Sequence, residues 1–176
     1  MKINEIEYGH FNKPSIAETA TLQNLALVGN YDDYAIYSVL ENGQNYYLIL
    51  DEANPTTYMG FIARDGKYLK ELYVKEKFRR MGIMSILILF ITRQLHQQLL
   101  LTSNEIVTDD SRKLIRQLHQ RNKIKVINKE TGINYTPDDL ALMFKDIDNK
   151  IELILESRLR GKSNSCYEIR NGADLD

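Results

Sequence analysis

The chain of 176 residues is 43% apolar and 27% charged, with a formal net charge of −1. This length and composition predict one globular domain with its own hydrophobic core. The longest nearly apolar run, residues 81–92, is too short to cross a bilayer, and the first residues lack the apolar region of a signal peptide. A single cysteine, Cys166, excludes an internal disulfide. We therefore expect a cytoplasmic protein, in a reducing compartment and without membrane contact.

Charge is distributed unevenly along the chain. Residues 61–125 contain 14 Lys/Arg and 6 Asp/Glu, whereas the remainder contains 9 Lys/Arg and 18 Asp/Glu. A basic centre in an otherwise acidic chain indicates a local anionic ligand. Solvated charge on helix faces is the alternative explanation. The basic segment 111–125 lacks a nucleic-acid recognition motif and the chain as a whole is not basic, which argues against binding to nucleic acid.

The first 74 residues are dominated by strand signals. Residues 2–8 alternate weakly and are predicted as a first strand. A helix is predicted to begin at Pro14-Ser15 and to end at Gly29-Asn30. Tight turns at Asn42-Gly43 and Asp65-Gly66 then predict a meander of four antiparallel strands. These strands are predicted at residues 34–40, 46–50, 58–63 and 68–74.

Beyond residue 74, helices and strands are predicted to alternate. A long apolar helix at 83–98 is followed by a strand at 105–108, a helix from Asp109 or Asp110 to Asn122, a strand at 123–128 and a helix start at residues 136–139. Residues 150–157 fit either a helix or a strand. The order predicts an α+β fold, a mixed and mostly antiparallel sheet flanked by helices. A single domain of residues 1–160 precedes a polar C-terminal extension, residues 161–176.

One stretch, residues 68–98, joins a strand, a basic turn and the apolar helix. Alternation along the strand puts Leu72 and Val74 on one face, and Leu69, Glu71 and Tyr73 on the other. In the turn, a glycine allows the backbone to approach a ligand closely, and the first N–H groups of the helix have no intrahelical partner. Such a turn can bind an anion, and pyrophosphate is a suitable ligand for it. Its residues are Lys75, Lys77, Arg79, Arg80 and Gly82.

The same stretch resembles motif A of the GNAT superfamily of N-acetyltransferases. The resemblance rests on Leu72-Tyr73-Val74, Phe78-Arg79, Gly82-Ile83 and on Ser85 with Leu87, and it extends over about residues 58–128. The family's Arg/Gln-x-x-Gly-x-Gly/Ala signature falls on Arg79, Gly82 and Met84, where methionine replaces the small third residue. The resemblance implies a GNAT-like fold with acetyl-coenzyme A as co-substrate.

In the family, the strands on either side of the cofactor splay apart, and the pantetheine arm pairs with the exposed edge of the motif strand. Pyrophosphate is held by backbone N–H groups of the loop. The resemblance therefore implies a set of coenzyme A-binding residues, which are Leu72, Val74, Arg79, Arg80, Met81, Gly82, Ile83, Met84 and Ser85.

Three residues are candidates for the chemistry of acetyl transfer. The acceptor ammonium must lose a proton before it attacks the thioester, and Glu71 on the motif strand could take that proton, with Tyr73 on the same face. The alternative is an ion pair of Glu71 with Lys67, with Lys75 or with a lysine of another strand. Alignment with the family puts His119 where many members carry a tyrosine that protonates the leaving thiolate. A surface or half-buried structural histidine is the other interpretation.

The sequence thus favours an acetyl-CoA-dependent N-acetyltransferase, an acyltransferase acting on a primary amine of a small molecule or a protein. The alternative is a non-catalytic protein of the same fold that serves assembly or binds a partner. The expected partners are coenzyme A and the amine, together with a homo-oligomer or protein contact through the C-terminal segment. No metal site is predicted, because His10, His96 and Cys166 do not form a metal-ligand spacing.

Overall fold

A computed structural model describes Ile16 and residues 24–102 and 109–158. Several predictions from the sequence concern other parts of the chain. The predicted strands at 2–8 and 105–108, the start of the predicted helix at Pro14-Ser15, His10, Cys166 and the polar C-terminal extension all lie outside the described residues.

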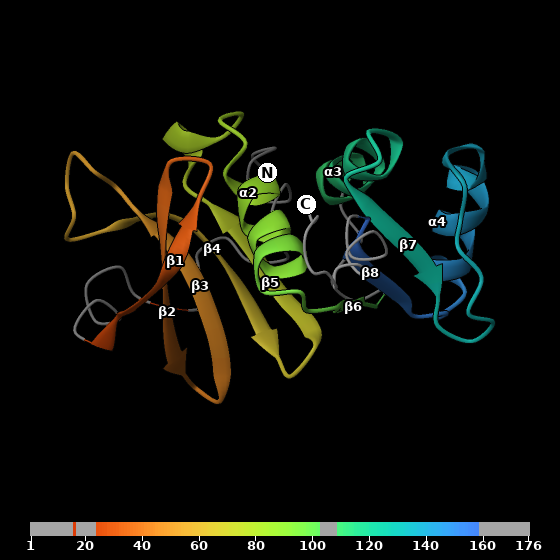
Figure 1. Cartoon of the computed structure of the whole chain (residues 1–176), viewed down its shortest axis with the longest axis horizontal. Helices are drawn as coiled ribbons and strands as arrows, with labels where there is room; N and C mark the ends of the chain where they lie inside the picture. The colour runs from red at the N-terminus through yellow and green to blue at the C-terminus, as the bar shows by residue number, and fades with distance from the viewer. Residues whose placement is uncertain (1–15, 17–23, 103–108, 159–176) are drawn as a thin grey trace, which may run out of the picture.

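The described elements form an α+β fold around an eight-stranded sheet, shown in Figure 1. The strand order is β1-β2-β3-β4-β5-β6-β8-β7, and every neighbouring pair is antiparallel except β5 and β6. The predicted mixed, mostly antiparallel sheet with flanking helices is therefore confirmed. The strands are β1 (Ala26–Tyr31), β2 (Tyr34–Glu41), β3 (Gln44–Leu50), β4 (Tyr58–Asp65), β5 (Tyr68–Val74), β6 (Leu99–Leu101), β7 (Ile124–Asn128) and β8 (Leu153–Ser157). The helical elements are the 3-10 turns η2 (Glu76–Phe78) and η4 (Pro137–Asp139), the α-helices α2 (Ile83–Leu89), α3 (Asp109–Gln120) and α4 (Leu140–Asp148), and the π-helical segment η3 (Phe90–Gln94).

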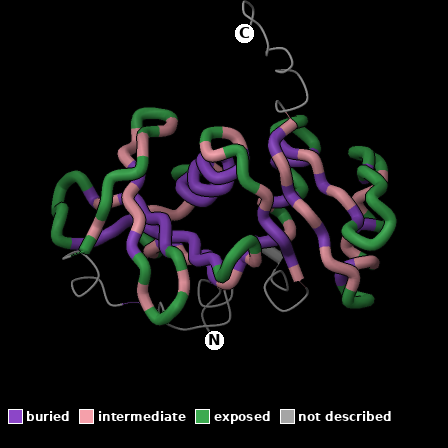
Figure 2. Tube along the Cα trace, turned by 60° about the horizontal axis from the view of Figure 1, so that its bottom comes forward, coloured by how far each residue is buried: buried purple, intermediate pink, exposed green. Residues whose placement is uncertain are grey.

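The main core lies between the sheet and the helices α2, α3 and α4. Helix α2 packs on β3, β4 and β5, and almost all of it is buried, as Figure 2 shows. A smaller, aromatic cluster includes Tyr46, Tyr58 and Phe61. Tyr73 joins this second cluster by stacking on Phe61, with ring centroids 5.6 Å apart. The meander therefore has apolar contacts on both faces, and the apolar residues of α2 form core as their all-round pattern predicts.

The meander has one strand more than predicted. The end of the helix predicted to stop at Gly29-Asn30 lies in strand β1, so that helix is wrong over residues 26–30. Leucine and alanine favour a helix, but Asp32 and Asp33 both adopt left-handed backbone conformations, with φ of 50° and 69°. That pair closes a tight hairpin between β1 and β2. Pairing with β2 therefore overrides the local helix propensity.

The helix that follows the motif turn is shorter than predicted. It was expected to run to residue 98, but α2 ends at Leu89 and continues as the π-helical segment η3 only to Gln94. His96 then takes a left-handed conformation, with φ of 54°, which ends the helical run. Residues 93–98, RQLHQQ, are mostly Arg, Gln and Leu, which favour a helix, so local propensity did not mark the end of the helix before β6.

Strand β5 carries a β-bulge that simple alternation does not predict. Pairing with β4 skips Lys70, since Glu71 and Leu69 pair with consecutive residues of β4. The extra residue changes the alternation, and Leu69 packs in the main core with Leu72 and Val74. The prediction that Leu69 shares a face with Glu71 is therefore wrong, whereas the shared face of Leu72 and Val74 is confirmed.

The two strands that form the parallel pair meet only at one end. Tyr68 at the start of β5 pairs with Leu100 of β6, and this is the single residue pair of their register. Farther along β5, the Lys75 N–H donates to a carbonyl of β4 at 2.9 Å. Because backbone groups alternate sides along a strand, those of Leu72 and Val74 point away from β4, toward the opening between β5 and β6.

The elements beyond β6 agree closely with the predictions. Asn122 takes the left-handed conformation expected at the end of α3, with φ of 56°. Thr136 and Asp139 form a capping box before α4, and the ambiguous segment 150–157 contains strand β8. At the closed end of the parallel pair, the Tyr68 hydroxyl donates to the Glu152 carboxylate at 3.0 Å, and the Lys129 ammonium donates to the same oxygen at 2.8 Å. These contacts tie the meander to the β7–β8 half of the sheet.

Candidate functional site

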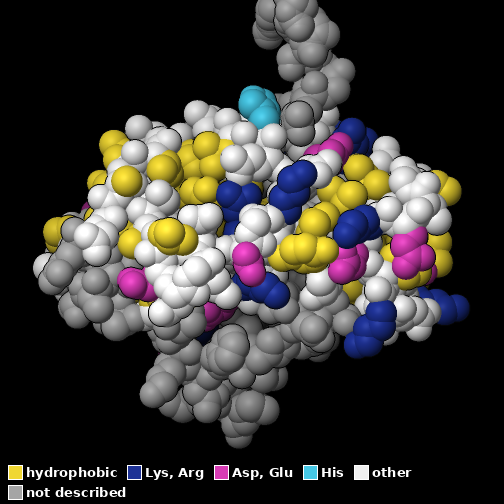
Figure 3. Space-filling view, turned by 90° about the horizontal axis from the view of Figure 1, so that it is seen from below, with side chains coloured by type: hydrophobic (Ala, Val, Ile, Leu, Met, Phe, Trp, Pro, Cys, Tyr) yellow, Lys and Arg dark blue, Asp and Glu magenta, His cyan; other side chains and the backbone are white. Residues whose placement is uncertain are grey.

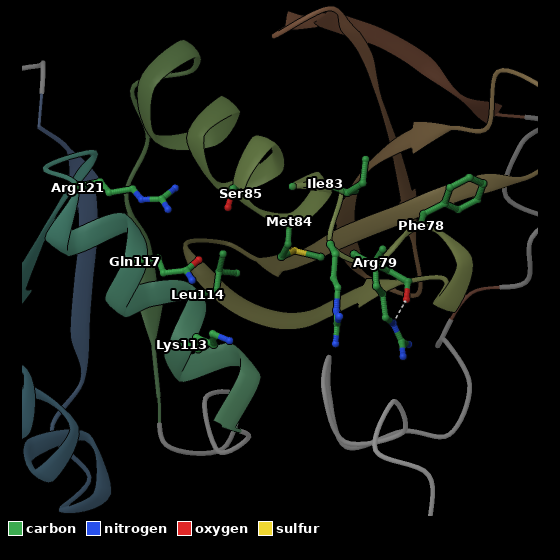
Figure 4. Close-up of a pocket in the computed structure, with 12 residues that line it drawn as sticks. Phe78, Arg79, Ile83, Met84, Ser85, Lys113, Leu114, Gln117 and Arg121 are labelled. Atoms are coloured by element: carbon green, nitrogen blue, oxygen red, sulfur yellow. Dashed lines mark hydrogen bonds between the residues drawn. The ribbon is translucent and has the colours of Figure 1, made fainter.

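The opening between the two halves of the sheet contains a cavity of about 600 Å³. Its wall is built by the end of β5, the turn that follows, the first turn of α2 and one face of α3, drawn in Figure 4. The twelve lining residues include four cationic side chains and, within this described lining, no Asp or Glu. The lining residues are Val74, Phe78, Arg79, Arg80, Gly82, Ile83, Met84, Ser85, Lys113, Leu114, Gln117 and Arg121.

The turn between β5 and α2 presents backbone donors to this cavity. Gly82 is the N-cap of α2, with φ of 78°, and the first helical hydrogen bond runs from the Ile86 N–H to the Gly82 carbonyl at 3.0 Å. The N–H groups of Ile83, Met84 and Ser85 therefore precede the intrahelical ladder. All three residues line the cavity, so the predicted anion-holding turn and the cavity coincide.

Arginine side chains flank the same turn. The Arg79 guanidinium donates from Nε to the Val74 carbonyl at 2.8 Å, which fixes its position beside the end of β5. Arg80 is exposed and adopts a left-handed backbone conformation, with φ of 70°. Because no Asp or Glu lies among the described lining residues, these charges make the electrostatic potential in the cavity more positive. On the underside of the molecule, by contrast, Lys/Arg and Asp/Glu lie side by side, as Figure 3 shows.

Helix α3 supplies the opposite wall, which the sequence analysis did not include in the site. Lys113, Gln117 and Arg121 are spaced by four residues and project toward the cavity in Figure 4. The buried face of α3 holds Ile115 and Leu118. The spacing of Lys113, Gln117 and Arg121 on a predicted helix was the available signal, but it does not say what that face meets.

Most of the predicted cofactor-binding residues come together at the cavity. Val74, Arg79, Arg80, Gly82, Ile83, Met84 and Ser85 line it, whereas Leu72 and Met81 do not. The Leu72 side chain is buried in the main core, so only its backbone can face the opening. Met81 lies beside Gly82 with its side chain 49% exposed. Met84, the departure from the family signature, is buried in the main core and reaches the cavity as part of its wall.

The predicted catalytic residues lie outside this lining. Glu71 is buried on β5, and Tyr73 packs in the aromatic cluster with Phe61. Both lie on the face of β5 opposite Leu72 and Val74, away from α2. An acid–base role for them therefore requires a substrate that reaches the other face of β5, and that role stays a prediction.

His119 is fully buried on α3 and does not line the cavity. Its Nε2 lies 3.0 Å from the Thr136 carbonyl, and since a carbonyl only accepts, this nitrogen carries the hydrogen. Its Nδ1 is buried without a hydrogen-bond partner among the described residues. Beside it, hydrogen bonds from the Thr136 backbone and hydroxyl lower the pKa of the Asp139 carboxyl. These contacts give His119 a structural role between α3 and the start of α4.

The part of the chain that the structure describes contains neither a metal-binding cluster nor a membrane-spanning helix. No cluster of three or more His, Cys, Asp or Glu side chains there is arranged to hold a metal ion. No helix within the same residues has the length and apolar character needed to span a membrane.

Comparison with known proteins gives no relative for this chain. No family model, no curated protein and no solved structure matches it. The described structure defines the site only as a cavity with four cationic side chains, lying between a parted strand pair and two helices.

Proposed function

We propose that the protein is an acetyl-CoA-dependent N-acetyltransferase of GNAT-like fold that transfers an acetyl group to a primary amine. The observation that carries this proposal is the cavity at the end of β5. It combines a cationic turn centred on Gly82 with the adjacent edge of β5, where the backbone groups of Leu72 and Val74 point away from β4 and into the opening. Coenzyme A has a pyrophosphate for the former and pantetheine amides for the latter.

The turn suits a pyrophosphate for electrostatic and geometric reasons. The N–H groups of Ile83, Met84 and Ser85 lead into the cavity wall, and Arg79 and Arg80 stand beside them. Charge-assisted hydrogen bonds to phosphate oxygens are stronger than neutral ones. Adding a Cβ to Gly82 would meet no protein atom within 4 Å, so the backbone here is open to a ligand.

The strand edge suits an amide-containing arm. A chain with alternating N–H and C=O groups can add to an open strand edge as a further strand does. The Val74 carbonyl already accepts a hydrogen bond from Arg79, so its N–H is the better donor for such an arm. The same N–H would stabilise the oxyanion that forms when the amine attacks the thioester, which makes the main electrostatic stabilisation independent of side chains.

One observation favours the second candidate, a non-catalytic coenzyme A-binding protein of the same fold. None of Glu71, Tyr73 and His119 lines the described cavity, and its ionisable side chains are all Lys or Arg. A protein that binds coenzyme A for assembly or regulation needs no general base. The two candidates share the ligand and differ only in turnover.

Calorimetry with acetyl-CoA tests the shared premise. The expected dissociation constant is below about 100 μM, and no binding at millimolar concentration refutes both candidates. Turnover is then measured as thiol release with a panel of small primary amines and lysine peptides. Release above the rate of spontaneous hydrolysis establishes the transferase, whereas tight binding without release from any amine favours the non-catalytic protein.

A further inference from the structure

Helix α3 carries two basic stripes with different surroundings. Arg112 and Arg116 face α4, where both guanidinium groups lie over the Phe144 ring, and Arg112 also pairs with Asp148. Lys113 and Arg121 face the cavity instead. Among the side chains that the structure describes, which do not include those of Asp109 and Asp110, no Asp or Glu lies within ion-pair distance of either. The cavity stripe therefore has no acidic counterpart in the described structure.

Both walls of the cavity, one at Gly82 and one on α3, are positively charged, but only the wall at Gly82 offers free backbone N–H groups. The wall at Gly82 has both N–H groups and arginines, and the α3 wall has side chains only. Like charges that share a cavity repel one another unless an anion lies between them. A compact anion bound at the Gly82 turn would leave Lys113 and Arg121 uncompensated on the other wall. A ligand with two separate phosphate groups can neutralise both walls.

We propose that Lys113 and Arg121 form a second phosphate subsite, with the Gln117 amide between them as an additional hydrogen-bond donor. This inference rests on the proposed function and deepens it, because coenzyme A carries a 3′-phosphate in addition to its pyrophosphate. That monoester bears close to two negative charges at neutral pH. The subsite makes the protein selective for coenzyme A over 3′-dephospho-coenzyme A, which is otherwise the same ligand.

The experiment compares calorimetric dissociation constants for coenzyme A and 3′-dephospho-coenzyme A in low-salt buffer. Wild-type protein is expected to bind coenzyme A at least about tenfold more tightly, the usual scale for hydrogen bonds to a charged group. In the Lys113→Gln/Arg121→Gln double variant, that ratio falls to near one, while the affinity for the dephospho form changes by less than about threefold. Lys145→Gln, which removes an exposed charge on α4 outside the cavity, leaves the ratio unchanged.

The outcomes separate this inference from the function on which it rests. Equal binding of the two compounds by wild-type protein overturns the second subsite and leaves coenzyme A binding intact. A wild-type preference that survives in the double variant places the 3′-phosphate elsewhere and also overturns it. Failure of wild-type protein to bind either compound refutes the proposed function and this inference together. Circular dichroism of the double variant shows whether α3 has kept its fold.

Discussion

Two glycines with nearly the same backbone geometry allow a matched test of the Gly82 turn. Gly82 has φ of +78° and Gly43, in the β2–β3 hairpin, has φ of +76°, and a Cβ at either would meet nothing within 4 Å. Replacement by alanine therefore adds no steric clash at either position. It costs the strain of a left-handed non-glycine residue, roughly 1–2 kcal/mol. For a chain of this length, that corresponds to a fall in melting temperature of about 2–8 °C.

Ligand binding should distinguish the two variants. Gly82→Ala puts a methyl group at the cavity wall, where the phosphate must approach the backbone, and is expected to weaken coenzyme A binding at least about tenfold. Gly43→Ala lies outside the cavity and should leave the affinity unchanged. Scanning fluorimetry gives the stability loss and calorimetry gives the affinity. Wild-type affinity in Gly82→Ala would refute the turn as the phosphate site, and an equal loss in Gly43→Ala would mean that binding reports only on stability.

Three further substitutions test the sheet and the chemistry. Gly60→Ala places a Cβ 2.7 Å from the Tyr73 carbonyl oxygen. The resulting overpacking should lower the free energy of unfolding, measured by urea titration, by about 1–3 kcal/mol. An unchanged midpoint of the urea titration would show that β4 and β5 separate freely there. The hydrogen bond from Lys129 lowers the pKa of Glu152, so its stabilising effect is present at neutral pH and is lost as pH falls below 4.5 through the folded-state pKa. Glu152→Gln should therefore be less stable than wild type at pH 7, and the difference should shrink as the pH falls below 4.5; a pH-independent difference would contradict the ion pair. Glu71→Gln should reduce amine acetylation at least about 100-fold with little change in coenzyme A affinity, while an unchanged rate removes Glu71 as the base.

Local chemistry made much of the fold predictable. The turn at Asn42-Gly43, the left-handed Asn122 and the helix start at residues 136–139 are decided by residues close together in the sequence, and each was predicted correctly. The turn at Gly82 belongs to the same class, because the glycine and the first helical N–H groups lie within a few residues of each other; that this turn holds an anion stays a prediction. These predictions needed no knowledge of distant contacts.

The errors arose where distant pairing decides the structure. Strand β1 contains good helix formers, and only its hairpin with β2 makes it extended. The segment before strand β6, residues 93–98, is rich in good helix formers, so the predicted helix was extended across it to the start of β6. Leu69 was assigned to the wrong face because the bulge at Lys70 depends on pairing with β4. In each case, the deciding partner is in another element.

In the candidate site, too, one wall could be predicted from contiguous sequence and the other could not. Its first wall, at Gly82, follows directly from a contiguous motif. Its second wall requires that α3 lie across from α2, a fact of tertiary structure, so Lys113 and Arg121 could be recognised as a helix face but not as part of the site. The surroundings of His119 were likewise not readable from the sequence, since its ring is fully buried and hydrogen-bonded to the Thr136 carbonyl, and its catalytic role stays a prediction.

The parting of β5 and β6 explains why both walls meet at one cavity. β5 pairs with β4 along its length but with β6 only at Tyr68, so the backbone edge at Leu72 and Val74 faces an opening. α2 follows β5 and α3 follows β6 in the chain, so the diverging strands bring a helix to each side of that opening. Backbone groups at the edge require water or a ligand as partner. A ligand that joins amides to phosphates satisfies the edge and both cationic walls together, whereas inorganic pyrophosphate can satisfy only the turn and should bind more weakly than coenzyme A.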